Sequence, residues 1–78
     1  MGRTPKKLRP AVELGTRIRA RRAELGLSQE ALAERAGFHS TFISSVERGE
    51  RNVSLMTILR LAKSLGTDPG QLLEGFQP

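Results

Sequence analysis

Short hydrogen-bonding side chains gather between residues 28 and 52, and their chemistry is that of binding rather than of catalysis. The chain of 78 residues contains no cysteine and a single histidine, His39, which excludes a cysteine nucleophile, thiolate metal ligands and a histidine metal cluster. It also contains no tyrosine or tryptophan, and it has neither a phosphate-binding loop nor a suitably spaced carboxylate pair. We therefore expect no enzyme activity, no metal and no cofactor.

The predicted helix over residues 40–48 has two sides of different character. At a step of about 100° per residue, one side is apolar apart from Glu47. The other side is short, polar and nearly flat, which suits contact with base edges in the major groove of double-stranded DNA. An ordinary solvated helix face is the alternative. The candidate base-reading residues on this side are Ser40, Thr41, Ser44, Ser45 and Arg48.

Polar residues at two predicted helix starts are candidates for contact with DNA phosphates. Ser28 is placed to cap a helix, and Gln29 then lies in its first turn, where free backbone N–H groups favour an anion. The alternative for Gln29 is an exposed helix former without a role. His39 precedes the next helix at a position where histidine is a poor cap, and it is either a phosphate contact or simply exposed.

Five short helices must position these residues. Apolar residues recur at helical spacing in each segment, glycines follow four of the segments as stop signals, and no segment remains for a sheet. We expect a compact all-α fold with a single domain over residues 11–78. The predicted helices cover residues 11–25, 29–36, 40–48, 55–65 and 69–74.

Residues 1–10 are predicted to form a flexible basic arm, because the segment is polar and contains two prolines. The net charge is +5, yet residues 11–78 hold nine basic and eight acidic residues, so the domain itself is nearly neutral. The arm would follow the DNA backbone or enter the minor groove, or else serve as a solubilising tail. Its basic residues are Arg3, Lys6, Lys7 and Arg9.

Arg22 and Glu47 each place a charge on an otherwise apolar helix stripe. A buried charge without a partner is costly, so we expect the two to form a structural ion pair that sets the pose of the helix over residues 40–48.

The chain resembles the XRE-like family of helix-turn-helix proteins, the group of Cro and the lambdoid phage repressors. The resemblance covers about residues 13–73, and its strength lies in the number of matching pieces in the right order. These pieces are Leu14-Gly15, Ile18, Leu25 to Glu30, Leu32-Ala33, Ala36-Gly37, Ile43-Ser44, Glu47-Arg48-Gly49, Ala62 and Leu65-Gly66.

The resemblance implies a five-helix, lambda-repressor-like domain, which usually acts as a homodimer on a palindromic operator to repress or activate transcription. It implies a phosphate contact for Gln29, and it places Arg48, Arg51 and Asn52 on phosphates beside the major groove. For Arg48 a guanine contact stays open, and for Arg51 and Asn52 ordinary loop polarity does. His39 departs from the family, which often has Ser or Thr there.

A C-terminal apolar edge of Leu72, Leu73 and Phe76, to which Val53 and Leu59 would add, is the predicted dimer interface. The alternative is that Leu72 and Leu73 only complete the core.

We therefore expect a cytoplasmic, sequence-specific transcriptional regulator that binds double-stranded DNA, with no membrane segment and no small-molecule ligand. The loop from Glu47 to Asn52 resembles the controllers of restriction–modification systems. The alternatives are an antitoxin that neutralises a partner protein and represses its own operon, and a non-specific nucleoid binder, which the nearly neutral domain disfavours.

Overall fold

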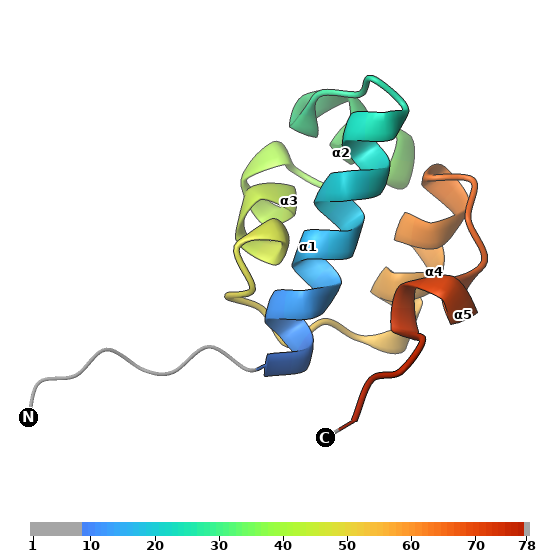
Figure 1. The fold of residues 1–78 in the computed structure, drawn as a ribbon. Coiled ribbons are helices and arrows are strands. Elements are labelled where there is room, and N and C mark those ends of the chain that lie inside the picture. Colours follow the sequence, from blue (N-terminus) through green and yellow to red (C-terminus); the bar gives the residue numbers. More distant parts are fainter. Residues whose placement is uncertain (1–8, 78) are drawn as a thin grey trace, which may run out of the picture.

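The protein was analysed as a computed structural model, which describes residues 9–77 and contains five α-helices and no strand within that range. Helix α1 packs against α3 and α5, α2 packs against α3 and α4, and α4 packs against α5. In Figure 1, α1 runs through the middle of the domain, with α3 on one side and α4 and α5 on the other. The helices are α1 (Arg9–Glu24), α2 (Gln29–Ala36), α3 (Ser40–Glu47), α4 (Leu55–Ser64) and α5 (Pro69–Leu73).

The helix boundaries follow the local sequence. The side chains of Ser28, Ser54 and Asp68 each accept a backbone N–H from the first turn of α2, α4 and α5, which satisfies donors that a helix start leaves unpaired. Gly37 ends α2 with φ of 79°, a left-handed conformation that glycine adopts without steric cost. The all-helical fold expected from the sequence is thus confirmed.

The first helix includes two residues that were predicted to belong to the arm, because α1 begins at Arg9 rather than at residue 11. Pro10 is tolerated there, since the first turn of a helix needs no backbone N–H from it. The predictions for Arg3, Lys6 and Lys7 fall outside the described residues.

One apolar core joins all five helices. Its fully buried large side chains come from α1, α2, α3, α4 and the residue that follows α4, so each helix contributes one face. These side chains are Ile18, Leu32, Ile43, Leu61 and Leu65.

Helix α1 approaches the end of α3 at backbone distance. A Cβ atom added to Gly15 would lie 2.6 Å from the carbonyl oxygen of Glu47 and would also meet that of Val46. Only a residue without a side chain allows this approach, which fixes the end of α3 against the body of the domain.

Candidate nucleic-acid interface

Helix α3 presents its N-terminal turn outward. Thr41 is exposed and Ser40 is half-buried, and neither hydroxyl makes a hydrogen bond to any residue from 9 to 77. His39 occupies the N-cap position in extended conformation, but its side chain makes no capping hydrogen bond. These three side chains therefore lie at the start of α3 with unused hydrogen-bonding groups.

Ser44 lies one turn and Arg48 two turns further along the same side, and Arg48 is engaged with both Ser44 and Glu50. Arg48 donates through Nη1 to the Ser44 hydroxyl, and through Nε and Nη2 to the Glu50 carboxylate at 3.0 and 3.1 Å. The hydrogen bonds that Arg48 donates to Glu50 raise the pKa of its guanidinium. Nη1 and Nη2 each keep a second hydrogen, so Arg48 can still donate to a base or a phosphate while it is paired with Glu50.

Ser45 departs from its predicted place on the exposed side, because it is only 8% exposed. Its hydroxyl donates to the carbonyl oxygen of Phe42 at 2.8 Å and accepts from Nε of Arg51 at 3.1 Å. Ser45 lies at the edge of the polar side, next to Phe42, and the Arg51 side chain from the loop after α3 covers that edge. The expectation that Ser45 faces outward with the other hydroxyls is therefore wrong.

The ion pair predicted from the sequence is present. Arg22 donates to both carboxylate oxygens of Glu47, from Nε at 2.7 Å and from Nη2 at 3.0 Å, and its Nη1 donates to the carbonyl oxygen of Leu27. The side chains are 15% and 3% exposed. The hydrogen bond with Glu47 raises the pKa of Arg22, so the guanidinium remains charged.

Gln29 joins this pair, which the sequence did not indicate. Its Nε2 donates to Oε1 of Glu47 at 3.0 Å, so the side chain at the start of α2 is oriented by the same carboxylate. An amide nitrogen carries two hydrogens, and the second is available to a phosphate. The Ser28 hydroxyl accepts the backbone N–H of Ala31 as the cap of α2, and its own hydrogen remains available to a phosphate.

Arg51 and Asn52 are exposed in the loop between α3 and α4. The Nη groups of Arg51 and the side chain of Asn52 make no hydrogen bond within the described part of the chain. Both therefore offer free donors beside α3.

A stack of two aromatic rings and two guanidinium groups was also missed from the sequence. The rings of Phe38 and Phe42 lie 4.9 Å apart between centroids. Arg60 lies over Phe38 at 4.5 Å and Arg51 over Phe42 at 5.4 Å, so the stack links the turn before α3 to the loop after it. The two phenylalanines are four residues apart in the sequence, but Phe38 lies in the turn before α3, so no helical pattern indicated that they meet.

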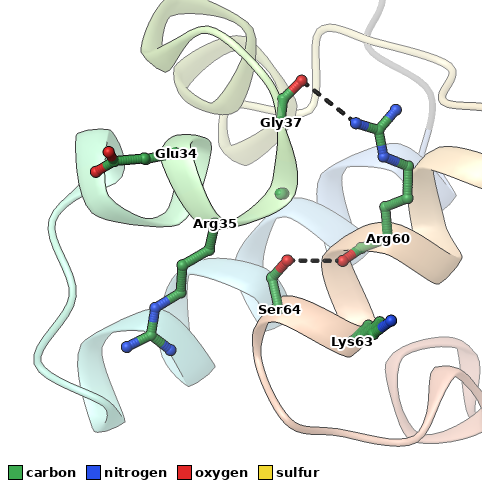
Figure 2. A pocket seen from close by; sticks show the side chains of 7 residues that line it. Glu34, Arg35, Gly37, Arg60, Lys63 and Ser64 are labelled. Carbon is green, nitrogen blue, oxygen red and sulfur yellow. Dashed lines mark hydrogen bonds between the residues drawn. The ribbon is translucent and has the colours of Figure 1, made fainter.

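A basic cleft between α2 and α4 lies beside this stack (Figure 2). Arg60 reaches the carbonyl oxygen of Gly37 there, and Ser64 donates to the carbonyl oxygen of Arg60. Arg35 and Lys63 lie in the last turns of α2 and α4, where a positive charge offsets the negative end of the helix dipole. The positive charge of the cleft thus follows from the two helix ends that border it.

The predicted dimer edge is largely closed. Leu72 is only 3% exposed and belongs to the core, while Leu73 and Phe76 are half-buried against it. Arg17 covers Phe76 at 4.5 Å from the ring centroid. The expectation of an open edge at Leu72 is therefore wrong, because the side chain completes the monomer core.

Three of the five large apolar side chains that are exposed among the described residues lie instead on α4. Leu55 is 66% exposed, Met56 63% and Leu59 39%, and of these only Leu59 was anticipated; the other two are Val12 and Leu25. An apolar groove is lined by Leu14, Val53, Ile58 and Phe76, and its lining also includes Arg51 and Asn52. Among residues 9–77, no helix is long and apolar enough to cross a membrane, and no group of side chains could hold a metal.

Known proteins share both this sequence and this fold. The control protein C.SmaI of Serratia marcescens is 52% identical over 60 residues, which are 77% of this chain and 71% of that protein. The restriction–modification controller protein C.AhdI from Aeromonas hydrophila superposes with a TM-score of 0.77 and 47% identity, over 80% of this chain and 94% of that one. The P22 c2 repressor of Salmonella phage P22, solved in complex with a synthetic operator, superposes with a TM-score of 0.74 and 40% identity, over 81% of this chain and 96% of that one.

A family of helix-turn-helix domains matches residues 13–74, which include α2 and α3 as the helix-turn-helix. The expected resemblance to the repressors is confirmed by these matches. The chain therefore belongs to the helix-turn-helix domain family and is a DNA-binding transcriptional regulator of the controller and phage-repressor type.

Proposed function

We propose that this protein regulates transcription as a homodimer on an inverted-repeat operator, with the outward side of α3 in the major groove. The observation that carries the proposal is the position of the free groups. The unbonded hydroxyls of Ser40 and Thr41 lie at the start of α3, and free donors of Gln29 and Arg51 are available beside it.

Base contacts are assigned to the outward side of α3. Thr41 can offer its hydroxyl to a base edge and its methyl group to a thymine methyl, and Ser40 and Ser44 can each donate or accept. Arg48 can contact a base or a phosphate through the second hydrogens of Nη1 and Nη2, which its bonds to Ser44 and Glu50 leave free.

Phosphate contacts are assigned to the flanks of α3. Gln29 is held by Glu47 and lies at a helix start, where the backbone also favours an anion. Arg51 and Asn52 supply donors from the loop, and His39 supplies one from the N-cap position. Ser28 would contribute through its hydroxyl hydrogen, because the capping bond uses only the hydroxyl oxygen as acceptor.

The dimer is assigned to the exposed face of α4. Leu55 and Met56 of one subunit would pack against the same exposed face of α4 in the other, and two-fold symmetry repeats the contact. The apolar groove is left out of this assignment, because Arg51 and Asn52, which are assigned to DNA, also line it. Two-fold symmetry also places the two α3 helices to read half-sites about 34 Å apart.

The biological role is proposed from the relatives. Two of the proteins described above are named control proteins, one explicitly of a restriction–modification system, and they match most of this chain. We infer that the present protein likewise controls the expression of a restriction–modification system.

Selection of bound sequences from random duplex DNA tests the proposal. Enrichment of an inverted repeat, together with loss of that preference in Thr41→Ala, is the expected result. Arg35→Ala serves as control, because Arg35 is an exposed arginine in the cleft between α2 and α4. Binding without enrichment and with steep salt dependence would refute operator recognition and favour a protein partner.

A further inference from the structure

Arg51 is held at two points of α3. Its Nε donates to the Ser45 hydroxyl at 3.1 Å, and its guanidinium carbon lies 5.4 Å from the centre of the Phe42 ring. Ser45 is in turn fixed, because its hydroxyl donates to the carbonyl oxygen of Phe42 at 2.8 Å.

These two contacts use one edge and one face of the guanidinium. The Nη groups remain without a hydrogen bond to any residue from 9 to 77, and Arg51 is exposed. A guanidinium that is anchored through Nε and a ring face keeps its remaining fork of donors in one orientation, as bidentate recognition of a phosphate requires.

We propose that Ser45 and Phe42 are positioning residues that hold Arg51 toward a DNA phosphate. The inference rests on the proposed function and deepens it. It also assigns Ser45 a role that differs from base reading: the serine acts on DNA through Arg51, and thereby fixes the phosphate contact relative to the helix that reads the bases.

The stack extends beyond Phe42. Phe38 lies 4.9 Å from Phe42, and Arg60 covers Phe38 from α4 while donating to the carbonyl oxygen of Gly37. The ring that carries Arg51 is therefore itself supported from α4 through Phe38.

A double-mutant cycle on the selected operator tests the inference. Arg51→Ala should weaken binding roughly ten- to hundredfold, as expected for a charge-assisted hydrogen bond, and should lower the slope of log K against log salt by about one. Ser45→Ala should weaken binding when Arg51 is present but cause no further loss in the Arg51→Ala background.

Ser64→Ala is the matched control. Ser64 also donates its hydroxyl to a backbone carbonyl of its own helix, but it contacts no arginine side chain in the described structure. It should leave binding unchanged. Thermal unfolding of each variant ensures that affinities are compared between folded proteins.

A measurement on the free protein tests the contact between Ser45 and Arg51 without DNA. In nitrogen-15 NMR spectra of the free protein, the Arg51 Nε–H should exchange slowly with water in the wild type and in Ser64→Ala, and rapidly in Ser45→Ala. Rapid exchange in all three proteins would overturn the inference.

The binding outcomes separate this inference from the proposed function. If Ser45→Ala weakens binding equally with and without Arg51, the positioning role is wrong while Arg51 keeps its phosphate contact. If Arg51→Ala changes neither affinity nor salt slope, the phosphate contact itself is refuted, and the inference fails with it.

Discussion

Arg22 and Glu47 are joined by two hydrogen bonds of 2.7 and 3.0 Å that tie the last turn of α1 to the end of α3. The Glu47 side chain is almost completely buried, at 3% exposure, so hydrogen-bond donors of the protein must replace water around its charge. It also holds Gln29 at 3.0 Å. One carboxylate thus connects the fold to both ends of the helix-turn-helix.

Removal of either partner should therefore destabilise the protein strongly. We expect Glu47→Ala to lower the free energy of unfolding by about 3–5 kcal/mol, because it leaves a partly buried guanidinium without a partner. The double variant with Arg22→Ala should lose less than the sum of the single losses, as measured by urea unfolding. Strictly additive losses would contradict the pairing.

The exposed pair Arg21–Glu24 provides the control. Its side chains are 35% and 66% exposed, and removal of Glu24 should change stability by no more than about 1 kcal/mol.

Gly15→Ala should destabilise the protein although alanine is the better helix former. The added Cβ would lie 2.6 Å from the Glu47 carbonyl oxygen, and overpacking of this kind typically costs about 1–3 kcal/mol. Gly70→Ala is the control, since its Cβ would meet only Asp68 at 3.6 Å. Thermal unfolding should show a lower midpoint for Gly15→Ala alone, and equal midpoints would argue against the close approach.

His39→Ser should stabilise the protein. The residue occupies the N-cap position with extended backbone and without a side-chain cap, and a serine there typically adds about 1 kcal/mol. Thermal unfolding measures this gain. Operator affinity measured beside it tests the proposed phosphate contact, because a more stable variant that binds more weakly would have lost a contact of its own.

Met56→Glu should separate the proposed dimer into monomers. Met56 is 63% exposed on α4, and burial of a carboxylate in an apolar interface is costly unless it is paired. Sedimentation equilibrium should give at least about a tenfold higher dissociation constant, equivalent to 1.4 kcal/mol. Leu25→Glu, a change at a 40% exposed leucine after α1, should leave the dimer intact; an unchanged dimer in Met56→Glu would place the interface elsewhere.

The sequence predicted those features that depend on local chemistry. The capping serines, the stop glycines and the 3.6-residue periodicity specify the helices, and the charges on two apolar stripes specify the pair of Arg22 and Glu47. The boundary at Arg9 was missed because proline is compatible both with a loop and with a first helical turn.

The errors at Ser45 and Leu72 have a common cause. A helical projection ranks residues by angle alone, whereas burial also depends on which loop or helix folds over an edge. Arg51 covers Ser45, and α5 turns Leu72 into the core. Such contacts between distant segments, like the stack of Phe38 and Phe42 with two arginines, have no local pattern from which to predict them.

The free hydroxyls of Ser40 and Thr41 also bear on how this protein can change over generations. Neither side chain belongs to the core, and neither makes a hydrogen bond within residues 9–77. Substitutions at these two positions should therefore leave the scaffold intact while they alter which operator is preferred. Related proteins can therefore diverge in operator preference through substitutions at these two positions. The same positions are the starting point for engineering regulators that do not bind one another's operators.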